Sequence, residues 1–150
     1  MLRSPEIPAM QATPPRTVKL DIASRLEMLD VVQTVLSHLA TLVGFKEDDV
    51  HFMTVAVRES VVNAIKHGNC MDESKRVAVE FVLSPSSIDV EVADEGKGFD
   101  PGSVADPVAQ ENLLKADGRG IFFMRSFMDT VSYSFPNGRG TVVRMTKRLA

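Results

Sequence analysis

The sequence predicts an α+β fold: a two-layer sandwich in which a mixed, mostly antiparallel sheet carries its helices on one face. Three observations predict it. Segments of alternating apolar residues follow one another in pairs, as the strands of hairpins do. Two longer segments, 24–43 and 50–69, repeat apolar residues every three or four positions, as amphipathic helices do. The chain has 150 residues, 44% hydrophobic and 25% charged, which suits one domain with one core.

The N-terminal segment differs in composition from the rest of the chain. Residues 1–15 hold four prolines and few large apolar residues. Because proline removes a backbone donor and disfavours helix, we expect a mobile tail here, with a partner-binding arm as the alternative. Residues 16–150 are expected to form the domain, and alternating apolar residues at 17–22 predict its first strand, at a sheet edge.

A helix is predicted to follow the first strand. Ser24 stands three residues before Glu27, the spacing of a capping box, so the helix is expected to begin at Ser24. Gly44 is expected to end it as a C-cap. The apolar stripe of this helix is Leu29, Val32, Leu36, Leu39 and Val43.

The second helix, residues 50–69, is apolar on most of its surface but carries a polar stripe. Glu59, Asn63 and His67 follow one another at four-residue spacing, so they lie along one side of the helix. A carboxylate and an amide on an otherwise apolar helix are costly unless something pairs with them. Two interpretations remain open at this point: a stripe satisfied by neighbouring backbone, or part of a functional site.

The remaining elements are predicted to be two hairpins separated by a loop and a helix. Alternation at 77–83 and 88–92 predicts one hairpin, and alternation at 131–135 and 141–147 around an Asn-Gly turn predicts the other. Between them, residues 100–117 have only a weak apolar pattern, and this length favours a mobile lid. A helix is expected from residue 118, with the apolar stripe Ile121, Met124, Phe127 and Met128.

Two glycine-bearing segments are candidates for ligand contact. Asp94 ends a predicted strand, and Gly96 and Gly98 follow it, which allows a ligand or another backbone to approach closely. The run Gly118-Arg119-Gly120 opens a predicted helix, where free N–H groups and the helix dipole favour an anion. Each segment alone also fits an ordinary turn, and neither matches a P-loop or a Rossmann fingerprint.

Taken together, these segments resemble the Bergerat-fold ATPases, the superfamily of gyrase, histidine kinases and mismatch-repair ATPases. The first box, an acid four residues before an asparagine, is met by Glu59 and Asn63. The D-x-G-x-G-F box is met by residues 94–99, and the G-x-G-[LI]-x-x-M box by residues 118–124. A closing Gly-Thr pair is met at residues 140–141, and the resemblance covers roughly residues 17–148.

Within that superfamily the chain is most similar to the anti-sigma-factor serine kinases. The sequence motifs N-A-I-K-H-G-N at residues 63–69 and F-M-D at residues 127–129 are similar to motifs of that family. The resemblance implies a protein-serine kinase that binds ATP and Mg²⁺, sequesters a sigma factor and phosphorylates a serine on a small antagonist protein. It also implies a homodimer.

The resemblance assigns a role to each matching residue. Glu59 would be the general base, and Asn63 would bind Mg²⁺ through its amide oxygen. Asp94 would hold the adenine amine, helped by the Thr141 hydroxyl. The glycines and the arginine of the two loops would contact the nucleotide: Gly96, Gly98, Gly118, Arg119 and Gly120.

Two other functions compete with the kinase. One is a non-catalytic module of the same fold that uses ATP to shape a partner surface; Glu59 favours the kinase over it. The other is a detached histidine-kinase catalytic domain, which the N-terminal strand and helix disfavour.

Composition and charge limit the classes of ligand and the location of the protein. A net charge of −3 without a basic block argues against nucleic acid as the main ligand, and no signal peptide or membrane span is expected, so a cytoplasmic location is predicted.

Overall fold

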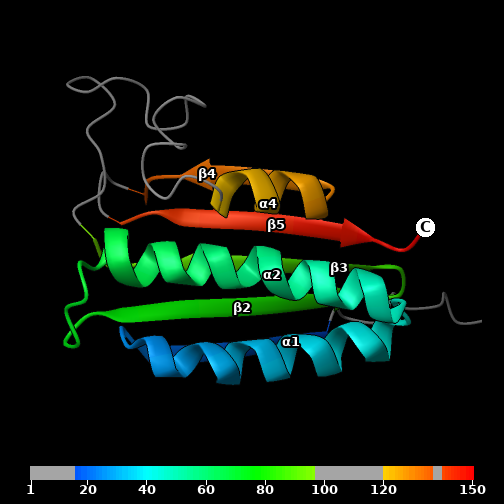
Figure 1. Cartoon of the computed structure of the whole chain (residues 1–150), viewed down its shortest axis with the longest axis horizontal. Coiled ribbons are helices and arrows are strands. Elements are labelled where there is room, and N and C mark those ends of the chain that lie inside the picture. Colours follow the sequence, from blue (N-terminus) through cyan, green and yellow to red (C-terminus); the bar gives the residue numbers. More distant parts are fainter. Residues whose placement is uncertain (1–15, 97–119, 137–139) are drawn as a thin grey trace, which may run out of the picture.

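The fold is a two-layer α+β sandwich, as the sequence predicts. The computed structural model describes residues 16–96, 120–136 and 140–150. Five strands form one sheet, in the order β1-β2-β3-β5-β4. The helices α1, α2 and α4 all lie on one face of this sheet (Figure 1). The predicted lid at 100–117 and the predicted tail at 1–15 lie outside the described residues.

All the strand pairings in the described ranges are antiparallel, so the sheet is not mixed as expected. Hairpins join β2 to β3 and β4 to β5, the chain passes from β1 to β2 through the helices α1 and α2, and the segment containing α4 carries it from β3 past β5 to the other edge. The strands are β1 (Arg16–Ala23), β2 (Arg76–Ser84), β3 (Ser87–Ala93), β4 (Thr130–Ser134) and β5 (Val142–Arg148). The strand predictions are therefore confirmed to within one or two residues.

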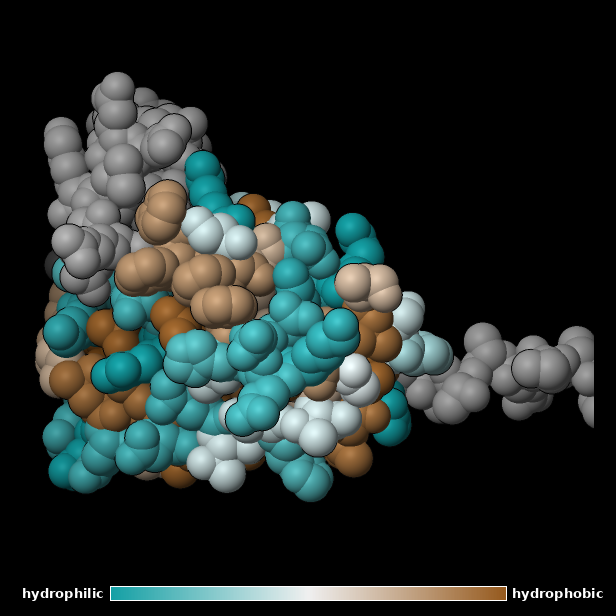
Figure 2. Space-filling model, turned by 45° about the vertical axis from the view of Figure 1, so that its right-hand side comes forward, coloured by the Kyte–Doolittle hydropathy of each residue, from teal (hydrophilic) through white to brown (hydrophobic). Residues whose placement is uncertain are grey.

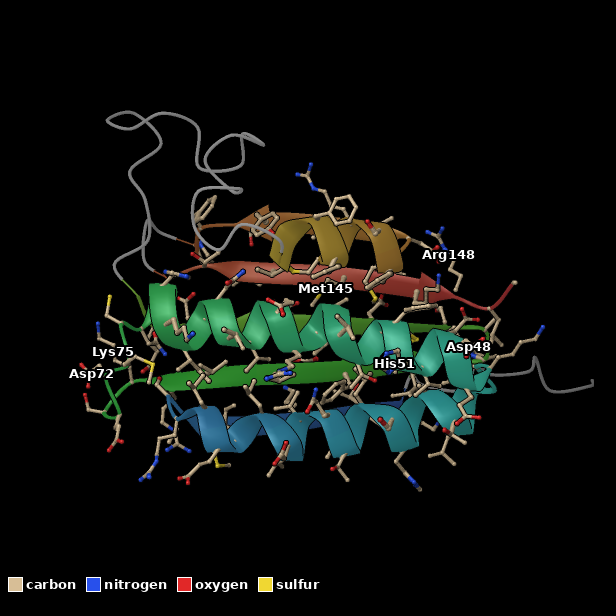
Figure 3. All side chains as sticks on the ribbon, viewed as in Figure 1. Asp48, His51, Asp72, Lys75, Met145 and Arg148 are labelled. Atoms are coloured by element: carbon tan, nitrogen blue, oxygen red, sulfur yellow. The ribbon has the colours of Figure 1, made fainter. Side chains whose placement is uncertain are left out.

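The core lies between the sheet and the helices. Strands β2 and β3 bury every second residue, because successive side chains of a strand point to opposite faces. Their inward side chains meet the buried faces of α1 (Leu29–Val43) and α2 (Glu47–Asn63). Figure 3 shows Met145, one of the fully buried residues, between β5 and the helices. The outward face is polar, as expected for an antiparallel sheet with one solvated side.

The predicted start of the first helix is wrong. The α-helix begins at Leu29, after a short 3₁₀-helix at Leu26–Met28, and no side chain caps either one. Ser24 instead is fully buried and donates to the Lys75 carbonyl oxygen at 2.6 Å, so its hydroxyl is engaged elsewhere. The predicted end is confirmed: Gly44 adopts φ 108°, where a residue with a Cβ would be strained.

The second helix ends at Gly68 and Asn69 as predicted, but its last turn is not α-helical. Its α-helical part closes at Asn63, and a π-helical turn, Ala64–Gly68, follows it. The backbone N–H groups of Asn69 and Met71 bond the carbonyls of Ala64 and Ile65, five and six residues back. Such π-turns are rare in proteins and occur frequently at functional sites. The widened turn brings Gly68 and Asn69 against the loop that follows β3.

Helix α4 (Gly120–Phe127) packs along α2 through stacked aromatic rings. Phe127 stacks on Phe52 with 4.7 Å between centroids, and Phe123 stacks on Phe127 at 5.7 Å. Because Phe52 lies near the start of α2 and Phe127 ends α4, the N-terminal end of α4 lies towards the C-terminal half of α2 (Figure 1). Figure 2 shows apolar side chains reaching this surface among hydrophilic ones; Phe52 and Phe122 are among the exposed apolar residues.

One helical segment is unusually apolar. By length and composition alone, Leu26–Val43 could cross a membrane, with a mean hydropathy of 1.3. In the structure its buried side chains pack into the core against α2 and the sheet. Core helices meet the same criteria of length and composition, so the segment is weak support for a membrane span, and the expectation of none stays a prediction.

Candidate functional site

The candidate site lies at the end of the sandwich where α2 finishes. The end of β3, the start of β5 and the π-turn after α2 meet there. In Figure 3 the labelled Asp72 and Lys75 lie at this end, and Asp48, His51 and Arg148 lie at the other. Three segments that are far apart in the sequence therefore form one corner of the molecule, which we call the Asp94 corner: residues 68–69, 94–96 and 140–141.

The Asp94 carboxylate is the centre of this corner. Its Oδ1 accepts hydrogen bonds from the backbone N–H groups of Gly96 at 2.9 Å and Thr141 at 3.1 Å. The Asp94 N–H donates in turn to the Thr141 carbonyl at 3.1 Å, and the Gly140 N–H donates to the Gly96 carbonyl at 2.8 Å. Backbone donors thus hold Oδ1, which leaves Oδ2 as the acceptor that can face a ligand.

Three glycines allow the backbone to approach this carboxylate. A Cβ on Gly68 would lie 2.2 Å from Asp94 Oδ2, and a Cβ on Gly96 would lie 2.3 Å from the Gly68 carbonyl oxygen. A Cβ on Gly140, which has φ +68°, would lie 2.3 Å from the Asp94 carbonyl oxygen. None of these distances is sterically possible without movement, so the corner requires glycine at all three positions.

Burial raises the pKa of the Asp94 carboxyl above its ordinary value. Hydrogen bonds from Gly96 and Thr141 oppose this shift, and so does the positive charge of Lys75, but burial is the larger effect. A half-buried carboxylate with one oxygen fixed by backbone donors is a strong acceptor for an amino group. Water solvates the other oxygen poorly, so a hydrogen bond from a ligand is favourable there.

Glu59 and Asn63 lie one turn apart on α2, as predicted. The Asn63 Oδ1 atom is buried and has no hydrogen-bond partner in the described part of the chain. An unpartnered buried amide oxygen is costly, and a hard cation would satisfy it. The residue therefore fits Mg²⁺, which needs few protein ligands because it keeps several waters and binds phosphate oxygens.

Only some of the other predicted site residues lie in the described part of the chain, and they lie in different places. Thr141 lies at the Asp94 corner, where its backbone contacts the carboxylate. Gly120 is the first residue of α4, whose N-terminal end lies towards the Asn63 end of α2. His67 is exposed on the π-turn. Gly98, Gly118 and Arg119 lie outside the described residues, so their roles stay predictions.

The prediction missed two residues of this corner, Gly68 and Asn69. Gly68 contacts the Asp94 carboxylate, and Asn69 is fully buried beneath the same loop. Two signals pointed to them: their place at the end of the helix, where Gly-Asn is typical of a simple stop, and the run N-A-I-K-H-G-N at residues 63–69, which resembles the family but gave them no role. A π-turn cannot be read from apolar spacing, because that spacing reports the face of a regular helix.

Comparison with known proteins gives the family of this fold and site. The family model of the histidine kinase-like ATPase domain matches residues 22–147, which is most of the chain. The chain belongs to this family. The predicted resemblance to the superfamily is confirmed, and membership implies that the chain binds ATP.

Two relatives are also similar to this chain over most of their length. A serine-protein kinase RsbW from Bacillus subtilis (strain 168) is 28% identical over 141 residues, covering 88% of this chain and 85% of the relative. The serine-protein kinase RsbW from Halalkalibacterium halodurans is 28% identical over 149 residues, covering 93% and 88%. The predicted resemblance to serine kinases of this superfamily is thereby confirmed.

A solved structure supports the fold. The crystal structure of the RsbU and RsbW domains of Rv1364c from Mycobacterium tuberculosis is similar, with a TM-score of 0.64 at 18% sequence identity. The match covers 91% of this chain and 33% of that longer chain. At this identity the likeness concerns the fold alone.

Proposed function

We propose that this chain is an ATP-dependent protein-serine kinase and anti-sigma factor. In this proposal it sequesters a sigma factor and transfers phosphate to a serine of a small antagonist protein. The similarity to serine-protein kinases over most of the chain supports the reaction class.

The observation that carries the proposal is the buried Oδ1 of Asn63, which lies one helical turn from Glu59 and has no hydrogen-bond partner among the residues that the structure describes. The folding cost of an unsatisfied amide oxygen is offset when a cation binds it. A carboxylate at one turn's distance lies within reach of a hydroxyl presented to the same nucleotide. A module that only sensed ATP would need the amide but not the carboxylate.

The proposed mechanism assigns one task to each of these residues. When bound, ATP would supply the phosphoryl group and Mg²⁺ would neutralise its charge. Asn63 would hold the metal through Oδ1, and Asp94 would orient the adenine by accepting from its exocyclic amine. Glu59 would accept the proton of the serine hydroxyl as the serine oxygen bonds to the γ-phosphorus and ADP leaves. Gly98, Gly118, Arg119 and Gly120 would contact the phosphates, and the Thr141 hydroxyl would assist at the adenine.

The proposal extends to assembly and location. We propose a homodimer that acts in the cytoplasm, with a sigma factor and the serine-bearing antagonist as alternative partners. Neither nucleic acid nor a membrane is part of the proposed cycle. The dimer is tested by light scattering of the purified chain, and sigma-factor capture by co-purification with and without ATP.

The decisive experiment compares Glu59→Gln with wild type. Phosphate transfer from labelled ATP to candidate serine-bearing antagonist proteins of the source organism is measured, with phosphoserine identified by mass spectrometry. Removing a general base should slow transfer by roughly 10²–10⁴-fold while ATP binding changes less than about threefold. Glu47→Gln is the matched control, because Glu47 is an exposed acid at the other end of the same helix.

The outcomes separate the alternatives. Transfer at the wild-type rate by Glu59→Gln would remove the general-base role. Magnesium-dependent ATP binding by wild type without transfer to any candidate would favour the non-catalytic switch. Absence of ATP binding by the folded protein would overturn both.

A further inference from the structure

We propose that Asn69 is a positioning residue for adenine recognition, because its amide fixes the loop that carries Asp94. This inference rests on the proposed function, in which Asp94 accepts from the adenine amine. Asn69 would act only through other residues: it contacts Glu95, which follows Asp94 in the chain, and it adjoins Gly68, which lies against the Asp94 carboxylate.

The Asn69 side chain is fully buried, and three hydrogen bonds engage it. Its Oδ1 accepts from the Glu95 N–H at 2.8 Å. Its Nδ2 donates to the Ser24 Oγ at 2.9 Å and to the Arg76 carbonyl at 3.0 Å. A single amide thus joins the end of β1, the start of β2 and the loop after β3.

Two of its connections meet at the carboxylate from opposite sides. On one side, the bond to the Glu95 N–H holds the residue between Asp94 and Gly96, and Gly96 donates to Asp94 Oδ1. On the other side, the backbone of Asn69 closes the π-turn on Ala64, which keeps Gly68 against Asp94 Oδ2. The contacts at Oδ1 and at Oδ2 of Asp94 are therefore both linked to Asn69.

Loss of the amide would affect geometry more than charge. In Asn69→Ala the Glu95 N–H loses its acceptor, and a donor left unpaired tends to move towards water. The loop 94–96 would then sample orientations in which Oδ2 no longer faces the adenine amine. Discrimination between purine bases would fall, while the contacts to phosphates, which come from other segments, would remain.

The test measures base discrimination instead of affinity alone. Calorimetric titration with ADP and with inosine diphosphate, which has a carbonyl in place of the amine, gives an affinity ratio. A site built around the amine should give wild type a ratio of at least about tenfold, because the carbonyl faces the carboxylate without a donor. We expect Asn69→Ala to lower this ratio at least about threefold.

Ser24→Ala is the matched control. It removes a hydrogen bond from the other end of the same amide and also the bond to the Lys75 carbonyl, but it leaves the Glu95 contact in place. A general loss of stability should therefore appear in both variants, and a loss of base discrimination only in Asn69→Ala. A folded Asn69→Ala protein with the wild-type ratio would overturn the proposal.

A second variant keeps the test decisive if Asn69→Ala does not fold. Asn69→Asp retains an oxygen acceptor for the Glu95 N–H but loses both donors. We expect it to be less stable and to keep the ratio; a folded Asn69→Asp protein without discrimination would contradict the role. A wild type that binds ADP and inosine diphosphate equally would overturn adenine recognition by Asp94 itself, and this proposal with it.

Discussion

The Asp94 corner and the layer between sheet and helices are held together in different ways. In the layer, apolar side chains such as Val79 and Phe81 pack with no exposed surface. At the corner, backbone groups contact a carboxylate, and glycines at positions 68, 96 and 140 leave no room for side chains. A core built from side chains tolerates changes of similar volume, whereas a corner built from backbone tolerates almost none.

This difference predicts that stability and nucleotide affinity can be changed separately. Substitutions in the layer should lower the free energy of unfolding without changing the affinity of the folded protein. Substitutions at the corner should lower nucleotide affinity more than they lower the free energy of unfolding. The predictions below test that separation, from the largest expected effect to the smallest.

The largest loss of stability is expected for Phe81→Ala. Phe81 is fully buried at the centre of β2, opposite Val18 and Val90. Truncating a buried phenylalanine costs about 3–5 kcal/mol of unfolding free energy, through lost burial and the cavity that remains. Urea denaturation measures it, and ADP titration of the folded fraction should be unchanged. Val82→Ala, on the solvated face one residue on, should cost less than about 1 kcal/mol.

Gly68→Ala should have the largest effect on nucleotide binding. The added methyl would overlap Asp94 Oδ2, so the carboxylate must move from its place. We expect ADP affinity to fall by roughly 100-fold, or about 2.7 kcal/mol, with a smaller loss of stability.

Gly44→Ala is the control for Gly68→Ala, and it separates strain from contact. Gly44 has φ +108°, and a Cβ placed there would have no atom within 4 Å, so alanine strains the backbone without touching the site. It should lower stability by roughly 1 kcal/mol and leave ADP affinity unchanged. Equal ADP affinity in Gly68→Ala and wild type would contradict the corner's geometry.

Asp94→Asn should weaken ADP binding while leaving stability unchanged or slightly raised. The amide oxygen can still accept from Gly96 and Thr141, but the amide nitrogen then replaces Oδ2 and opposes the adenine amine donor. Affinity should fall roughly 10-fold, about 1.4 kcal/mol. Calorimetry measures the affinity and thermal unfolding the stability. Asp30→Asn, at an exposed acid on α1, should change neither.

The sequence predicted most of the fold because its elements are regular. Alternation located the strands, and apolar spacing located α1 and α2 and put Glu59 and Asn63 on one side of a helix. The boxes around Asp94 and Thr141 predicted two segments that do meet, although 47 residues separate them. Regular patterns report local conformation directly, so the strand and helix predictions needed no tertiary information, whereas the meeting of the Asp94 and Thr141 segments was implied by the family resemblance.

The parts that could not be predicted depend on tertiary contacts. Ser24 suited a helix cap by its spacing, but the Lys75 carbonyl and the Asn69 amide engage its hydroxyl from distant segments. The π-turn likewise depends on Asn69 being held by β2 and the loop after β3. Local rules describe a residue's nearest neighbours along the chain, and both outcomes are decided by partners that lie elsewhere.

The smallest effect, and the finest test of the comparison, concerns pH. Burial raises the pKa of Asp94 in the folded protein, so the folded state binds a proton more readily than the unfolded state does. Its ionisation therefore costs stability at neutral pH, and that cost disappears as pH falls through the raised pKa towards the ordinary value. The unfolding free energy of wild type should accordingly rise relative to that of Asp94→Asn as the pH falls.

Nucleotide binding should respond to pH in the opposite direction. A protonated Oδ2 no longer accepts from the adenine amine, so ADP affinity should fall as pH falls through the same raised pKa. Because the phosphates of ADP also titrate, the measured quantity is the affinity ratio of wild type to Asp94→Asn, followed from about pH 7.5 down to about pH 4.5. The ratio should approach one in acid. A constant affinity ratio would mean that protonation of Asp94 does not compete with its hydrogen bond to the adenine amine. If the affinity ratio and the stability difference changed at different pH, the two effects would belong to different groups.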